Sequence, residues 1–349
     1  MKKLFTLLLL FFTIGVVDSY GSHLMGGEIT WICQRTGPNT GKFKFTVKLY
    51  RDCNGITAPA SVTLTSNAPG LAGGIFCNQV STLDLSPVGP GCPTCNTPGG
   101  KPNAVLECIY ESAFINITGV PPATGWYFAY FDCCRNGAIT NLAGTGSGNF
   151  TLRALMFPYN ATNTNPCYDT SPRFAERPQL ATMIGNLTTY SANAVDEDGD
   201  SLHYDWGQPL DGTTYPGANY PFAAGYTYQT PLPNPAQNPL NQSATLDPNS
   251  GTVTFTPFTV GSYVTVTKVS SFRCGIKIAE VYREIQISLL ASVNVANNVG
   301  NIVGNTPPDI DPVVLPPSFQ VYGVNQFVDT VFAGDTVKLP ITAYDFEHV

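Results

Sequence analysis

The sequence predicts an all-β protein, with a disulfide-rich N-terminal β-domain, a β-sandwich after it, and the start of a second sandwich. Short stretches of alternating apolar and polar residues recur along the 349 residues, separated by turn residues, at the spacing typical of sandwiches. The 33 glycines and 29 prolines argue against long helices. Eight of the ten cysteines lie between Cys33 and Cys134, so we expect the disulfides to staple the N-terminal part.

Residues 1–21 have the pattern of a secretory signal peptide. Two lysines precede an apolar run over residues 4–17, and the triplet at 19–21 has the small–any–small pattern of a cleavage site. The apolar run is shorter than the roughly 20 residues that a membrane-spanning helix needs. We therefore expect cleavage before Ser22 rather than a membrane anchor, no membrane insertion afterwards, and a secreted or cell-surface location.

Charged residues make up only 12% of the chain, about half the usual share. The formal net charge is −7, and it becomes −8 when a leader that carries Lys2, Lys3 and Asp18 is removed. An acidic mature chain without basic clusters is a poor candidate for binding nucleic acid or anionic lipid.

An even number of cysteines in an exported chain indicates disulfides first. Cys92 and Cys95 have the CxxC spacing that also suits zinc or redox chemistry, but no second CxxC follows and the chain has three histidines. The adjacent Cys133 and Cys134 are expected to pair with distant partners, because bonding to each other closes a strained ring. Spacing leaves the pairing open among the candidates Cys33, Cys53, Cys77, Cys92, Cys95, Cys108, Cys133, Cys134, Cys167 and Cys274.

The first domain is expected over residues 22–165. Strands are predicted at 28–33, 42–50, 60–66, 104–116, 125–132 and 150–157, because apolar and polar residues alternate there. Residues 68–103 are rich in glycine, proline and cysteine and predict long, disulfide-tied loops. The polar stretch at 158–172 predicts the domain boundary.

The second domain is expected over residues 166–292. Strands are predicted at 188–194, 201–206, 252–256, 261–270 and 279–290, at the spacing of a β-sandwich. The long segment 209–241 is rich in proline, tyrosine and asparagine, and a loop of this length often carries function.

Between the first two of these strands lies an acidic turn, with Asp196, Glu197, Asp198 and Asp200 around Gly199. Carboxylates this close repel one another, and a hard cation with oxygen ligands relieves the repulsion. We expect a bound Ca²⁺ at this turn; a solvated acidic hairpin is the alternative. The spacing does not fit an EF-hand, since the twelfth position counted from Asp196 is a glycine instead of a glutamate.

Residues 293–306 are uncharged and predict a linker, and residues 307–349 predict the first part of a second sandwich. Residues 343–347, AYDFE, match residues 194–198, AVDED, and each segment follows a proline-containing entry, at 307–308 and at 171–172. The match makes Asp345 a further candidate Ca²⁺ ligand. It also indicates an array of similar domains, of which this chain is expected to be a fragment.

Seven stretches in one order carry a family resemblance: SHLMGGEITW (22–31), KLYRDCNG (48–55), CCRNGAITN (133–141), SPRF (171–174), AVDEDGDSLHYDW (194–206), LDPNSGTVTFTP (246–257) and SSFRCGIKIAEVYREIQIS (270–288). They resemble the N-terminal region of large, adhesin-like surface proteins of Bacteroidetes bacteria, often gliding-motility-associated. The resemblance covers nearly all of residues 22–290. It implies export by the general secretory route, followed by passage through the outer membrane by type IX secretion, and so an extracellular location associated with the outer membrane.

The second domain is similar to cadherin-like or polycystic-kidney-disease-type immunoglobulin-like modules, whose acidic turns hold Ca²⁺. That similarity implies ligand roles for Asp196, Asp198 and Asp200, and by extension for Asp345. Members of the family often have a cysteine between the SPRF-like entry and the acidic turn, and residues 181–185 here have none. Cys274 is therefore expected to pair differently, for instance with Cys167, or to stay free.

The sequence favours a non-catalytic binding protein. No HExxH, GxSxG or phosphate-binding loop occurs. The expected partner is a glycan, a protein or an abiotic surface, and a cap or spacer of a surface filament is the alternative. A glycan-acting enzyme using Glu107, Glu111 or Asp132 is a weaker alternative. The candidates for stacking on a sugar are Trp126, Tyr127, Tyr215, Tyr220 and Tyr226.

Overall fold

The computed structural model describes residues 24–55, 57–85, 95, 104–144, 148–159 and 167–291, and six short strand segments after residue 294. In these residues it contains 24 strands and no helix, which confirms the predicted all-β class. The contacts divide the chain into two compact units, Met1–Leu290 and Ala291–Val349. A helix long and apolar enough to span a membrane is not found in the described part of the chain. The expected signal peptide lies outside the described residues.

The first seven strands contain most of the N-terminal core. They are β1 (Leu24–Cys33), β2 (Phe43–Asp52), β3 (Ser61–Ser66), β4 (Ile75–Asp84), β5 (Val105–Ser112), β6 (Trp126–Cys133) and β7 (Asn149–Met156). In β2 the predicted alternation holds, since Phe43, Phe45 and Val47 are buried while Lys44 and Lys48 are partly exposed. β4 lies where a loop was expected. Its inward residues Ile75 and Cys77 are buried between β3 and β5, but the surrounding glycines and prolines hid its alternation.

These strands form a closed ring with β18 (Ile276–Leu290). The pairing order is β1–β2–β5–β4–β3–β6–β7, and β18 pairs with both β1 and β7. The ring encloses a core in which the rings of Trp31, Phe45 and Phe128 lie 4.5–6.3 Å apart. Where β1 crosses β18, a Cβ on Gly26 would collide with the backbone oxygen of Glu284, so only glycine fits.

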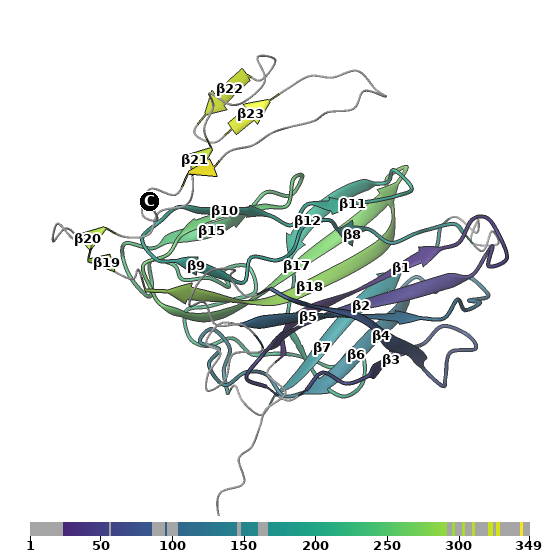
Figure 1. The fold of residues 1–349 in the computed structure, drawn as a ribbon. Helices are drawn as coiled ribbons and strands as arrows, with labels where there is room; N and C mark the ends of the chain where they lie inside the picture. Colours follow the sequence, from purple (N-terminus) through teal and green to yellow (C-terminus); the bar gives the residue numbers. More distant parts are fainter. Residues whose placement is uncertain are drawn as a thin grey trace, which may run out of the picture. The chain divides into compact units, whose positions relative to one another are not determined.

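Most of the remaining strands of the first unit lie around a long hairpin of β17 (Gly261–Arg273) and β18 (Figure 1). A three-stranded sheet, β10–β16–β15, covers one part of this hairpin. There Val253 and Phe255 of β16 pack with Tyr263, Ile285 and Ile287. The bounds are β8 (Arg173–Phe174), β9 (Ala181–Met183), β10 (Thr188–Ser191), β11 (Ala194–Val195), β12 (Ser201–Trp206), β13 (Leu210–Asp211), β14 (Ala218–Asn219), β15 (Gln242–Leu246) and β16 (Thr252–Thr256).

The two domains expected over residues 22–165 and 166–292 are joined in one compact unit. β18, the last strand of the expected second domain, hydrogen-bonds to β1 and β7 of the first. Buried ion pairs, Arg283–Glu28 and Arg135–Glu284, cross the same boundary. The polar residues Asp169, Thr170 and Ser171 of the expected boundary are buried, so their composition does not mark a linker, and composition alone cannot show which strands pair across it.

The described segments of the second unit form three antiparallel strand pairs. They are formed by β19 (Val295–Ala296) with β20 (Ile302–Val303), β21 (Asp309–Ile310) with β24 (Ala343–Tyr344), and β22 (Gln320–Gly323) with β23 (Gln326–Val328). The first pair lies inside the expected linker 293–306. β21 and β24 pair as Asp309↔Tyr344 and Ile310↔Ala343, and β8 and β11 pair as Arg173↔Val195 and Phe174↔Ala194. When residues 194–198 are aligned with residues 343–347, the β21–β24 pair has the same register as the β8–β11 pair.

Among the described cysteines, three pairs are bonded: Cys33–Cys167, Cys53–Cys95 and Cys133–Cys134. The expectation that Cys133 and Cys134 each pair with a distant cysteine is wrong, because the two are bonded to each other across a cis peptide bond. Cys77, Cys108 and Cys274 are free, and Cys274 is the exposed one of the three. Cys92 lies outside the described residues.

The free thiols are expected to differ sharply in reactivity. Burial raises the pKa of Cys77 to about 12 and also raises the pKa of Cys108, so neither forms the nucleophilic thiolate near neutral pH. In native protein at pH 8, iodoacetamide should modify Cys274 and leave Cys77 and Cys108 unmodified until urea unfolds the chain. Peptide mass mapping of native and unfolded samples checks this, and labelling of Cys77 in native protein at the rate of Cys274 would contradict it.

Candidate functional site

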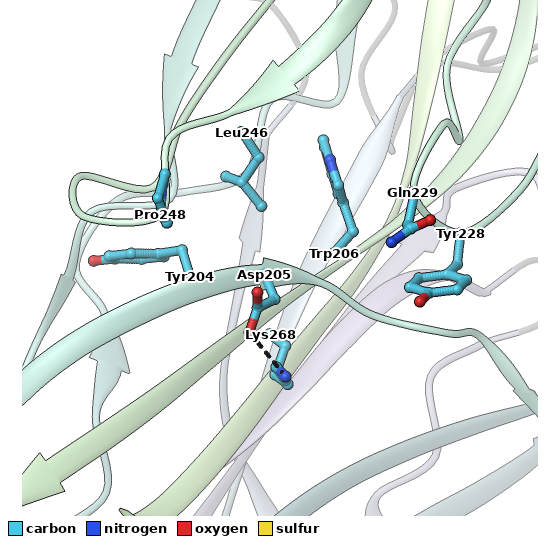
Figure 2. A pocket seen from close by; sticks show the side chains of 8 residues that line it. All are labelled: Tyr204, Asp205, Trp206, Tyr228, Gln229, Leu246, Pro248 and Lys268. Atoms are coloured by element: carbon cyan, nitrogen blue, oxygen red, sulfur yellow. Dashed lines mark ion pairs between the residues drawn. The ribbon is translucent and has the colours of Figure 1, made fainter. Parts of the chain in front are cut away.

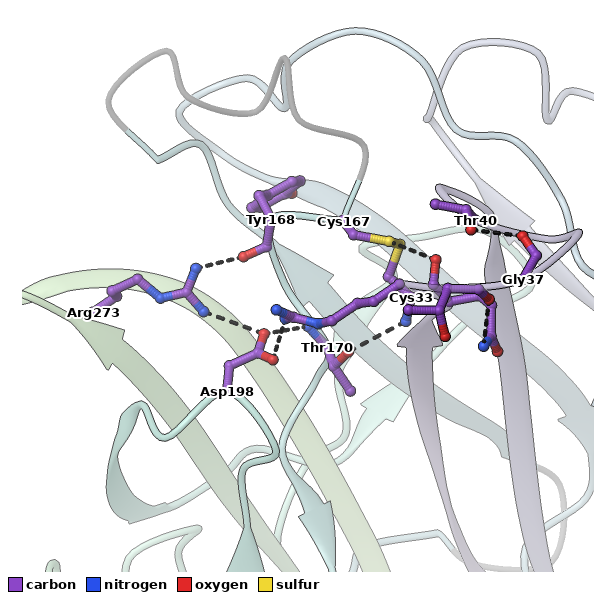
Figure 3. Close-up of a disulfide and its surroundings, with 11 residues drawn as sticks. Cys33, Gly37, Thr40, Cys167, Tyr168, Thr170, Asp198 and Arg273 are labelled. Carbon is purple, nitrogen blue, oxygen red and sulfur yellow. Dashed lines mark hydrogen bonds and ion pairs between the residues drawn. A yellow bond between two sulfur atoms is a disulfide. The ribbon is translucent and has the colours of Figure 1, made fainter.

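Two polar regions flank β12 in the first unit. A pocket lies beside its C-terminal half (Figure 2), and the acidic turn precedes its first residue (Figure 3). In the turn, Gly199 adopts a φ of 76°, a left-handed conformation that favours glycine. Oδ1 of Asp196 accepts the N–H groups of Asp198 at 2.9 Å and of Asp200 at 3.2 Å. These hydrogen bonds stabilise the turn. They explain why the carboxylates of Asp196, Asp198 and Asp200 lie close together.

The fold adds a fourth carboxylate, Asp169. One oxygen each from Asp169, Asp198 and Asp200 lies within 4.8 Å of the other two. Ca²⁺ binds oxygen at roughly 2.3–2.6 Å, so ligands on opposite sides of the ion are at most about 5 Å apart. The three oxygens therefore lie close enough together to share one ion. Sequence reasoning missed Asp169 because it stands 27 residues before Asp196, in a stretch without a recognisable pattern.

Two arginines reach the same cluster. Nη2 of Arg273, at the end of β17, lies 2.6 Å from Oδ2 of Asp200, 3.2 Å from Oδ2 of Asp198 and 3.9 Å from Oδ1 of Asp169. Arg35 pairs with Oδ1 of Asp198 from the end of β1. Figure 3 shows the Arg273 and Asp198 side chains meeting beside the Cys33–Cys167 disulfide. The arginines compensate only part of the negative charge.

Asp169 is the least compensated member of the cluster. Its residue is 0% exposed, and neither carboxylate oxygen has a hydrogen-bond partner. Burial, followed by the charges of Asp196 and Asp198, raises the pKa of Asp169 well above its ordinary value. Oδ2 of Asp196 is also buried without a partner, and burial raises the pKa of Asp196 to about 6. A buried carboxylate without a hydrogen bond is costly, so the site favours either a proton or a cation.

The charges of the cluster can be counted directly. Asp169, Asp196, Asp198 and Asp200 contribute −4 when ionised, and Arg35 and Arg273 contribute +2, which leaves −2. A divalent ion would neutralise this charge. Because the acidic ligands offer only oxygen, the donor set suits a hard cation such as Ca²⁺ better than zinc or copper. Asp345, the other predicted ligand, lies outside the described residues.

The aromatic residues predicted to stack on a sugar do not form a surface platform. Trp126, Tyr220 and Tyr226 are buried, with 4%, 3% and 8% of their surfaces exposed. Tyr127 and Tyr215 stack on each other with their ring centroids 4.4 Å apart. Residues 209–241 fold back onto the strands, so Tyr220 and Tyr226 join core clusters instead of facing solvent, and Tyr215 packs against a third cluster.

The carboxylates considered for glycoside hydrolysis each have a structural partner. Glu107 is buried, with Arg177 at 3.7 Å; Glu111 pairs with Lys44; and Asp132 accepts the Tyr130 hydroxyl at 3.0 Å. Glu107 and Glu111 are four residues apart on β5, about 13 Å along the strand. Glycosidases place their two carboxyl groups about 5–9.5 Å apart, so this pair does not have the required spacing.

The acidic cluster therefore combines buried carboxylates, an uncompensated charge and an oxygen-only acidic donor set, an arrangement suited to binding a divalent cation. No protein-family model and no curated protein matches this chain.

Proposed function

We propose that the protein is a non-catalytic, exported cell-surface protein of the adhesin-like kind, whose β-sheet unit is stapled by disulfides and stabilised by Ca²⁺. One observation carries the proposal: Asp169 is fully buried, has no hydrogen bond, and lies against a turn of three further carboxylates. The ligands would be Asp169, Asp196, Asp198 and Asp200. When bound, Ca²⁺ would supply the charge that the two arginines leave uncompensated.

The disulfides support export. Cys33–Cys167 and Cys53–Cys95 join residues far apart in the sequence, and such bonds persist in oxidising compartments outside the cytoplasm. The signal-like pattern at residues 1–21 is consistent with the same route.

The register of the short strand pairs supports an array of similar modules, of the immunoglobulin- or cadherin-like kind. β21–β24 in the second unit reproduces the pairing of β8–β11 in the first, and Asp345 follows β24 as Asp196 follows β11. A repeated module is also what a purely structural cap or spacer would contain. The two functions differ in whether the protein binds a specific ligand.

Calorimetric unfolding of the purified protein, with Ca²⁺ and with a chelator, tests the proposal. Ca²⁺ at 100 times its Kd should stabilise the folded state by about 2.7 kcal/mol, which corresponds to a rise in Tm of roughly 5–10 °C. Asp169→Asn should abolish this rise. The chelated variant should be at least as stable as the chelated wild type, because the substitution removes a buried carboxylate that accepts no hydrogen bond.

Glu197→Gln is the matched control. Glu197 belongs to the same turn, but its side chain is 53% exposed and pairs with Arg173 at 3.3 Å. This variant should keep the full response to Ca²⁺. The proposal fails if Ca²⁺ leaves the Tm of the wild type unchanged, or if Asp169→Asn responds like Glu197→Gln.

A further inference from the structure

The pocket beside β12 has a volume of about 350 Å³, which is within the range of small-molecule sites. β12 is the last strand on its side of the large sheet, so the pocket opens at a sheet edge. Its walls are the C-terminal half of β12, Lys268 of β17, a turn that carries Tyr228 and Gln229, and the chain at the end of β15 (Figure 2).

Three aromatic side chains line this pocket, and one of them, Tyr204, is buried. Trp206 is half-buried at the end of β12, and Tyr228 is 40% exposed. The turn that presents Tyr228 is held in place by Thr227 and Thr230, whose hydroxyl groups lie 2.8 Å apart and whose backbones exchange hydrogen bonds. Tyr228 is therefore an exposed ring on a fixed support, unlike the buried tyrosines of the neighbouring segment.

The polar groups of the pocket include a matched ion pair. Nζ of Lys268 lies 2.9 Å from Oδ2 of Asp205, and Nε2 of His203 lies 3.5 Å from Oδ1 of the same carboxylate. Gln229 adds an exposed amide. The pair supplies acceptors and donors side by side with a net charge of zero, so the pocket favours a neutral ligand over an ionic one.

From this combination we infer that the Trp206–Tyr228 pocket binds a neutral carbohydrate, as a pyranose ring of a glycan. A pyranose presents a face of C–H groups, which packs on aromatic rings, and a rim of hydroxyls that both donate and accept hydrogen bonds. Tyr228 and Trp206 would contact the ring face, and the Asp205–Lys268 pair and Gln229 would bind the rim. The inference rests on the proposed function as a binding protein and names its ligand class.

Saturation-transfer NMR on the purified protein tests the inference, with a panel of neutral methyl pyranosides and neutral oligosaccharides as probes and sialic acid and glucuronic acid as charged comparators. At least one neutral sugar should receive saturation. Tyr228→Ala and Lys268→Met should each weaken its binding about tenfold or more. Tyr228 is exposed, so its replacement should leave the Tm unchanged.

Phe76→Ala is the matched control, since Phe76 is 66% exposed on β4 and does not line the pocket. It should bind the sugar as the wild type does. The inference is overturned if no neutral sugar binds, if only the acidic sugars bind, or if Tyr228→Ala binds as well as Phe76→Ala. A protein that responds to Ca²⁺ but fails this test retains the proposed Ca²⁺-stabilised unit and loses only the carbohydrate site. If sugar binding depends on Tyr228 but the protein does not respond to Ca²⁺, the carbohydrate site is retained and the Ca²⁺-stabilised unit is lost.

Discussion

Replacing Arg135 by methionine is expected to lower the free energy of unfolding by about 3–5 kcal/mol, because the substitution leaves the carboxylate of Glu284 buried without its counter-charge. The two side chains are 1% and 4% exposed and form a bidentate pair. Arg135 also donates hydrogen bonds to the backbone oxygens of Asn149 and Leu210, at 3.1 and 3.0 Å. The substitution therefore removes an ion pair and two links between strands at once.

Urea unfolding followed by circular dichroism measures this change. Arg173→Met is the control, because Arg173 and Glu197 form an exposed pair worth less than about 1 kcal/mol. Replacing both members of the buried pair, as Arg135→Met with Glu284→Leu, should recover part of the lost stability, since no charge then remains buried. Equal effects of Arg135→Met and Arg173→Met would contradict the prediction.

Removing the Cys33–Cys167 disulfide, by replacing both cysteines with serine, is expected to cost about 2–5 kcal/mol. The bond joins residues 134 positions apart, so its loss frees a long loop in the unfolded chain. The same variant should show a smaller rise in Tm with Ca²⁺. Asp169 follows Cys167 by two residues, and the disulfide holds this segment beside β1 and the acidic turn.

Other bonds to β1 should limit the displacement of the segment. Ser171 Oγ accepts the N–H of Trp31 at 2.9 Å, and Thr170 Oγ1 accepts the N–H of Cys33 at 3.3 Å. The expected result is therefore a weakened Ca²⁺ response with a folded protein. Serine replacement of both Cys133 and Cys134, which lie at the end of β6, is the control and should leave the response unchanged. Calorimetry with and without Ca²⁺ measures both, and an undiminished response in the Cys33/Cys167 variant would contradict the predicted coupling.

Local sequence patterns were sufficient for features that involve neighbouring residues. The alternation over residues 42–50 predicted β2 because a strand with one buried face must place apolar side chains at every second position. The three carboxylates of the acidic turn were predicted because they lie within five residues of sequence. In the structure, one Asx-type turn holds them together. β4 was not predicted, because its alternation of buried and exposed residues is short and its flanks are rich in glycine and proline.

Features that depend on distant partners could not be predicted in this way. Periodicity shows that a residue faces inward or outward, but it does not show which strand lies on the next edge. It thus could not reveal that β18 closes the ring of β1–β7, or that Tyr220 and Tyr226 pack into the core. Likewise, the polar composition of residues 158–172 could not show whether they form a domain boundary or a segment that is bonded to β1.

By itself, the sequence determined the all-β class, most of the longer strands and the acidic turn, because each follows from the chemistry of residues close together in the chain. Only the tertiary structure brought Asp169 and two arginines to that turn, paired Cys33 with Cys167, and formed the Trp206–Tyr228 pocket at the edge of β12. The physical reason is the same in each case: these groups come from separate strands and loops, and strand pairing and burial of the core decide which of them meet.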